Sequence, residues 1–222
     1  MTGAVFTVTY PEPEFNRKEI LRYALCKEET ADVKNLMEEC ISEVRGKLSC
    51  KVCWCETCVN LGENFADFGF MRIESKNLCK NLEGCDSAVL FGATVGLYMD
   101  RLIAKYGRVS PAKAVMMQAV GAERIEALCD AFNADVRAKA EENGHFTKPR
   151  FSPGYGDLSL ETQKDIFAVL DCPRKIGLSL NDSLLMTPSK SVTAIIGLTG
   201  KKEQDKGEKC AACQKFDCQF RS

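Results

Sequence analysis

The chain has 222 residues, of which 45% are hydrophobic, and this suits one large globular domain with short appendages. Its 30 Lys and Arg residues nearly balance its 31 Asp and Glu residues, and no long basic block occurs, which argues against a nucleic-acid-binding protein. The longest apolar run, around Ala194–Leu198, is too short to span a bilayer, which argues against a membrane protein.

The first fifteen residues are strand-like and then rich in turns. Residues 1–10 have neither the basic region nor the continuous apolar stretch of a signal peptide, so we expect a cytoplasmic protein. Asn16 is predicted to cap a helix that begins at Arg17, and Thr30 or Asp32 to start a second one. The apolar face of that second helix comprises Val33, Leu36, Met37, Cys40, Ile41 and Val44.

The middle of the chain is predicted to contain two strands followed by helices. Residues 48–59 and 65–73 alternate in the manner of strands, and Ser75 is suited to cap a short helix that ends near Leu82. Residues 84–94 lead into a helical pattern that continues to about Lys105. Gly107 is expected to stop that helix.

A long helix is predicted to follow. Ser110 and Pro111 form a strong helix start, with a capping serine before a proline at the first helical position. The apolar pattern then continues to about Asn143, with Gly121 as the expected point of a bend.

The last elements complete the predicted fold class. Ser159 is suited to cap a helix over residues 160–170, and residues 192–198 read as a strand. Helices are long, strands are few, and no βα alternation repeats, which favours an α+β fold with an antiparallel sheet. We expect residues 1–200 to form one globular domain, 201–209 a charged linker, and 210–222 a cysteine-rich tail.

The segment Arg150-Phe-Ser-Pro-Gly-Tyr155 predicts a binding site. Pro153 fixes its own φ, and Gly154 can take the positive φ that a type II turn needs at that position. The chain folds back there, so Arg150 and Tyr155 can face one site. The planar fork of an arginine suits a carboxylate, and a tyrosine adds a flat apolar face with a polar tip. Together they describe a pocket for a small carboxylate or zwitterionic ligand.

Two motifs, with a predicted helix between them, resemble the S-adenosylmethionine-binding activation domain of cobalamin-dependent methionine synthase. The family has an Arg-x-x-Pro-Gly-Tyr turn before a helix and a Met-x-Pro-x-x-Ser turn before a strand. The residues that match are Arg150, Pro153, Gly154, Tyr155, Met186, Pro188 and Ser191. The resemblance covers about residues 75–198 and implies long helices packed on a bent antiparallel sheet.

The resemblance also implies roles for single residues in binding S-adenosylmethionine. Arg150 would bind the methionyl carboxylate, and the main chain at Ser152 the adenine, within the turn shaped by Gly154. Tyr155 would lie between the ligand and the corrin. Glu126, on the long helix, would contact the ammonium or sulfonium region; the alternative is that it belongs to an ordinary solvated helix face. The family's N-terminal Asp-Trp-Thr-Pro segment and its late tyrosine have no counterpart here.

The function that the resemblance implies is that of a stand-alone activation module in methionine biosynthesis. The partner would be a cobalamin-binding methionine synthase or another corrinoid protein that supplies the cobalamin. The module would support the reductive remethylation of cob(II)alamin, with an electron from a flavodoxin- or ferredoxin-type donor. The homocysteine, folate and cobalamin portions are missing, so we expect no complete enzyme and no catalytic acid or base.

Thirteen cysteines suggest a second possibility. With no export signal, most are expected to be reduced thiols, and six are expected to be packing residues: Cys26, Cys40, Cys79, Cys85, Cys129 and Cys172. The tail motif Cys210-x-x-Cys213-x-x-x-x-Cys218 suits zinc or an iron–sulfur cluster, although it is one ligand short. The alternative functions are therefore a cysteine-rich metal or redox protein serving a corrinoid methyltransferase, or a non-catalytic interaction subunit.

Overall fold

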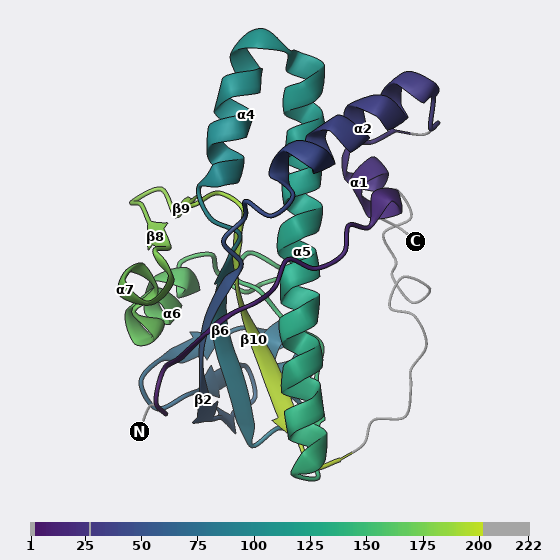
Figure 1. The fold of residues 1–222 in the computed structure, drawn as a ribbon. Helices are drawn as coiled ribbons and strands as arrows, with labels where there is room; N and C mark the ends of the chain where they lie inside the picture. Colours follow the sequence, from purple (N-terminus) through teal and green to yellow (C-terminus); the bar gives the residue numbers. More distant parts are fainter. Residues whose placement is uncertain (1–2, 27, 202–222) are drawn as a thin grey trace.

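One antiparallel sheet separates two layers in the computed structural model, which describes residues 3–26 and 28–201 (Figure 1). In spatial order its strands are β1 (Phe6–Thr9), β2 (Lys51–Cys58), β6 (Ser87–Thr94), β10 (Ser191–Thr199) and β7 (Phe146–Thr147). Every neighbouring pair is antiparallel, and Phe91 at the centre lies between Trp54 and Ala194. The predicted α+β class is confirmed.

One face of the sheet is covered by α5 (Pro111–Glu142), against which three further helices pack: α1 (Arg17–Tyr23), α2 (Ala31–Val44) and α4 (Tyr98–Val109). Figure 1 shows that α5 runs along the whole sheet and then continues beyond it, where it pairs with α4. The core of this layer packs Phe91 of the sheet against Phe132 of α5, with ring centroids 4.8 Å apart.

The helix starts follow the predicted caps. The side chain of Asn16 accepts a hydrogen bond from the Glu19 backbone N–H, and that of Thr30 from Val33, both at 3.3 Å. Pro111 is the first residue of α5, as predicted, but the Ser110 side chain makes no capping hydrogen bond.

The helix α5 runs through Gly121 without a break, so the expected bend is not needed to explain this glycine. A Cβ atom at Gly121 would lie 2.9 Å from the Lys190 side chain and 3.0 Å from that of Met99. The glycine therefore allows close packing of α5 against its neighbours.

The second layer covers the opposite face with short elements. They are β3 (Asn60–Leu61), β4 (Phe65–Asp67), β5 (Arg72–Glu74), α3 (Lys76–Asn81), α6 (Thr162–Leu170), α7 (Cys172–Ile176), β8 (Ser179–Leu180) and β9 (Met186–Thr187). Their core packs residues such as Phe167 and Leu170 of α6 against Leu90 and Ile195 of the sheet.

Three sequence predictions for the middle of the chain were wrong. Residues 87–94 form the central strand β6, because a strand buried on both faces is continuously apolar and cannot be told from a helix by periodicity. The helix α4 continues past Gly107 to Val109. Residues 65–73 do not form one strand, since β4 and β5 pair as a hairpin around Gly69, whose φ is +82°.

The ten described cysteines are all free, and most are buried. Cys53 and Cys55 lie in the core of the second layer and Cys50 in that of the first, as strand alternation predicts. Of the six expected packing cysteines, Cys26 and Cys79 are only partly buried. In the described part of the chain, no helix is both long and apolar enough to cross a membrane.

Candidate functional site

The turn after Arg150 is built by local backbone chemistry. The Tyr155 N–H donates to the Ser152 carbonyl at 3.2 Å, and Gly154 between them has a φ of +91°, as a type II turn requires. Phe151 then exchanges two backbone hydrogen bonds of 2.9 Å with Ile195 of β10. The turn is therefore fixed to the sheet, and it places Arg150 beside α5.

Arg150 makes two ion pairs with α5. Its guanidinium donates to Glu126 at 2.5 Å and to Asp130 at 2.6 Å. Burial disfavours the charge, but the hydrogen bond to Asp130 and the charge of Glu126 outweigh it and raise the pKa of Arg150 above its usual value. The arginine therefore remains a cation, with its side chain only 23% exposed.

A hollow of about 540 Å³ opens beside this ion pair, a size typical of small-molecule sites. Both sequence motifs line it. The lining residues are Glu126, Arg150, Phe151, Ser152, Pro153, Tyr155, Gln163, Met186, Ser191, Val192 and Thr193.

The second motif forms the far wall of the hollow. The Ser191 hydroxyl oxygen lies 2.7 Å from the Pro188 carbonyl oxygen and 2.8 Å from the Thr94 hydroxyl oxygen, so it fixes the turn to β6. The Ser189 N–H donates to the Asp100 carboxylate at 3.1 Å. Lys190 lies between Ser189 and Ser191 in the chain. Burial lowers the pKa of Lys190, and the nearby negative charge of Asp100 opposes this effect.

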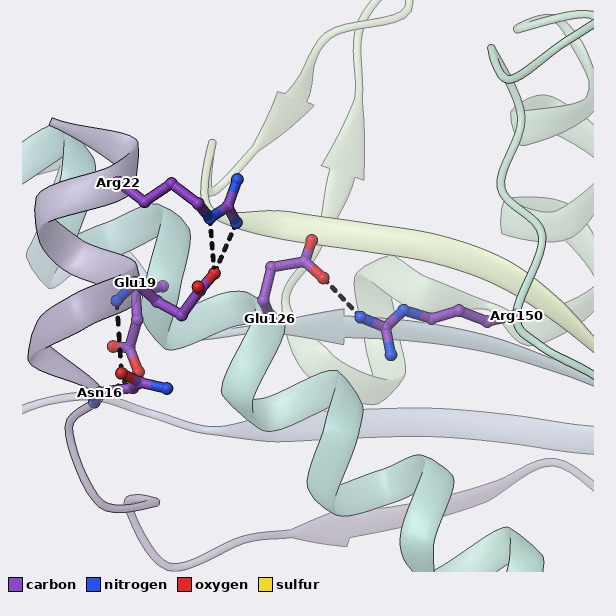
Figure 2. Close-up of polar contacts among 6 residues, drawn as sticks. Asn16, Glu19, Arg22, Glu126 and Arg150 are labelled. Carbon is purple, nitrogen blue, oxygen red and sulfur yellow. Dashed lines mark hydrogen bonds and ion pairs between the residues drawn. The ribbon is translucent and has the colours of Figure 1, made fainter. Parts of the chain in front are cut away.

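The helix α1 lies on the other side of Glu126. Burial raises the pKa of Tyr23, and the negative charge of Glu126 raises it further. Arg22 stacks on the Tyr23 ring at 4.3 Å and pairs with Glu19. In Figure 2 the Glu126 carboxylate points into the space between α1 and Arg150. Glu126 therefore lies in a charged environment of both signs.

Four of the five predicted ligand-binding residues line the hollow. Arg150 and Glu126 form its charged side, Ser152 belongs to the turn, and Tyr155 lies at the rim with 69% of its surface exposed. The fifth, Gly154, shapes the turn through its positive φ.

Sequence reasoning missed Asp130, Gln163 and Thr193. Asp130 follows Glu126 by four residues and so shares its helix face, which was an available signal. Gln163 and Thr193 stand in no motif, and only the tertiary fold brings them to the hollow.

The sequence from residue 78 to 204 matches the family model described as vitamin B12 dependent methionine synthase, activation domain. This is more than half of the chain. The chain belongs to this family. Comparison with curated proteins gives no significant match.

A solved structure shares the activation-domain fold. It is the crystal structure of the MetH reactivation domain bound to AdoHcy, with a TM-score of 0.66 and 14% sequence identity. The similarity covers 91% of this chain and 80% of that one. At this identity the similarity establishes the fold, which agrees with the predicted long helices on an antiparallel sheet.

No metal site is visible in the part of this activation domain that the structure describes, where no three His, Cys, Asp or Glu residues are grouped to hold an ion. The predicted ligands Cys210, Cys213 and Cys218 lie outside the described residues. Cys53 and Cys172 do meet, with their sulfur atoms 3.7 Å apart, but they form a pair without further ligands.

The activation domain has a second, more apolar hollow of about 360 Å³ between the sheet and the far end of α5. Trp54 and Phe132 form its walls, and Tyr10, hydrogen-bonded to Asp135 at 2.6 Å, lies at one side. Neither sequence motif contributes to it, so the hollow beside Arg150 is the candidate site.

Proposed function

We propose that this chain binds S-adenosylmethionine in the hollow beside Arg150 and presents it to a cobalamin-binding partner. One observation carries the proposal: Arg150 and Glu126, of opposite charge, lie 2.5 Å apart on the wall of a hollow that both family motifs line. An amino-acid ligand carries a carboxylate and an ammonium at similarly close range. Arg150 and Glu126 match those two charges.

The residues present fit this ligand. Arg150 would bind the carboxylate with a charge-assisted fork, and Glu126 would stabilise the ammonium in a partly desolvated site. Asp130 and Glu126 together outweigh Arg150 by one negative charge, which favours a cationic sulfonium ligand over a neutral thioether. Tyr155, exposed at the rim, offers an apolar ring where a partner's corrin would approach.

The chain itself supplies binding and orientation, with no acid or base required. Bound S-adenosylmethionine would supply the methyl group that the reduced cobalamin of a methionine synthase or another corrinoid protein accepts. A flavodoxin- or ferredoxin-type protein remains the predicted electron donor, and zinc or an iron–sulfur cluster at Cys210, Cys213 and Cys218 remains a prediction that metal analysis would test.

Calorimetry with S-adenosylmethionine tests the proposal. We expect Arg150→Met and Glu126→Gln each to weaken binding about 10- to 100-fold, because each removes one charge-assisted hydrogen bond. Arg137→Met is the control, since Arg137 is an exposed arginine of α5, the helix of Glu126, and does not line this hollow. Absence of binding at millimolar ligand, or equal effects of Arg150→Met and Arg137→Met, would reject the proposed function.

A further inference from the structure

Two buried polar side chains on the wall of the hollow each have an oxygen without a hydrogen-bond partner among the described residues. Gln163, in α6, is 5% exposed, and Thr193, in β10, is 2% exposed. Among the residues that the structure describes, neither Gln163 Oε1 nor Thr193 Oγ1 finds a partner. They are thirty residues apart in the sequence, yet both line the hollow that contains Arg150.

Two other buried atoms in the described ranges share this property, but their circumstances differ. Glu12 Oε1 and Asn81 Oδ1 also lack partners. The second oxygen of Glu12 accepts from the Gly46 N–H at 2.8 Å, and the Asn81 amide donates to the Pro149 carbonyl at 3.2 Å. Those two side chains are therefore anchored by another contact, whereas no side-chain hydrogen bond of Gln163 or Thr193 is found among the residues that the structure describes.

A buried polar group without a hydrogen bond destabilises the protein that carries it. Apolar side chains of the same shape would remove this cost, and the surrounding core of Ile166, Phe167 and Ile195 is apolar. Two such groups on one wall of one hollow would each gain a hydrogen bond from a partner that enters the hollow, if the side chain turns its buried oxygen toward that space.

We propose that Gln163 and Thr193 bind the uncharged, nucleoside part of the ligand. This inference rests on the proposed function and extends it from the charged end of the hollow to its neutral side. An amide combines an acceptor with two donors and can pair with the edge of an adenine, while a hydroxyl can pair with a ribose hydroxyl. Arg150 and Glu126 are charged and would serve the amino-acid end of the same ligand.

The experiment replaces each group by an apolar one of similar shape and measures stability and binding together. The variants are Thr193→Val and Gln163→Met, and the probe is S-adenosylhomocysteine. We expect each variant to bind the probe about 10-fold more weakly than the unaltered chain. Without ligand, each should melt about 2–4 °C higher, because an unsatisfied buried group has been removed.

Thr199→Val is the matched control. Thr199 lies on the same strand and is also 2% exposed, but its hydroxyl donates to the Gly84 carbonyl at 2.8 Å. Its replacement should lower the melting midpoint and leave the affinity unchanged.

The possible results separate the two proposals. If the unaltered chain binds and both variants bind equally well, the role of Gln163 and Thr193 is overturned while the proposed function stands. If the melting midpoints of Thr193→Val and Gln163→Met fall, as that of Thr199→Val should, the proposed role is also overturned, since both groups would then have hydrogen-bond partners without ligand. If the unaltered chain binds neither S-adenosylhomocysteine nor S-adenosylmethionine, the proposed function fails and this inference with it.

Discussion

Replacing Arg124 by methionine is expected to destabilise the protein by about 4 kcal/mol, because the change breaks a buried ion pair from one side. Arg124 is fully buried, and its guanidinium lies 2.6 Å from the Glu123 carboxylate, itself 3% exposed. It also donates to the carbonyls of Pro13 and Glu14 and stacks on Phe15 at 3.7 Å from the ring centroid. Methionine would leave a buried carboxylate and two carbonyls without this donor.

A loss of this size is readily measured. Urea unfolding, followed by the fluorescence of the single tryptophan, Trp54, should show the loss, and the melting midpoint should fall by about 8–16 °C. The double change Glu123→Gln with Arg124→Met should recover at least about 1 kcal/mol, since the uncompensated charge is gone. Arg137→Met, on the exposed side of the same helix, should stay within about 0.5 kcal/mol. A loss below about 1 kcal/mol for Arg124→Met would show that the pair contributes little.

Two further predictions concern a pH dependence and a thiol. Hydrogen bonds from Ser75 and from the Lys76 and Asn77 backbone N–H groups lower the pKa of Asp157 in the folded protein. The ionised Asp157 therefore stabilises the fold at a pH above its pKa in the unfolded chain, and this stabilisation is lost as the pH falls through its pKa in the folded protein. Asp157→Asn should therefore lower the melting midpoint at pH 7, and the difference should shrink as the pH falls and the Asp157 carboxylate is protonated; a difference that stays constant as the pH is lowered would contradict the assignment. Cys58 is exposed, whereas Cys40 is buried and burial raises the pKa of its thiol to about 11. Peptide mapping after brief maleimide treatment at pH 8 should find Cys58 labelled before Cys40, and the reverse order would refute the burial argument.

Local signals in the sequence were enough to predict the starts of α1, α2 and α5. Asn16, Thr30 and Pro111 act within one turn of the chain, so their effect does not depend on the rest of the fold. The central strand β6 could not be predicted in the same way. Both its faces are buried, and its residues Ala88–Phe91 are uniformly apolar, so the alternation that marks a half-buried strand is absent.

In the candidate site, too, some residues could be predicted from local signals and others depend on long-range packing. The turn at Pro153 and Gly154 is determined by backbone preferences. Arg150 and Tyr155, on either side of it, line one hollow, as predicted. The partners that complete the hollow come from α5, α6 and β10, and their positions depend on long-range packing. Gln163 and Thr193 therefore could not be predicted as site residues from the sequence, since only the tertiary structure shows that they are buried and that their side-chain oxygens lack partners among the described residues.

The helix α5 carries both a buried ion pair and the acidic residues of the candidate site. Glu123 and Arg124 fasten residues 13–16 to the helix, with the Asn16 N–H donating to Glu123 at 3.0 Å, and this places α1 beside the site. One turn further, Glu126 and Asp130 hold the guanidinium of Arg150. Charges fixed on a packed helix need no ordering when a ligand binds, so less of the binding energy is lost to conformational entropy. The buried pair at 123 and 124 therefore keeps α1 beside Glu126 without itself touching the hollow.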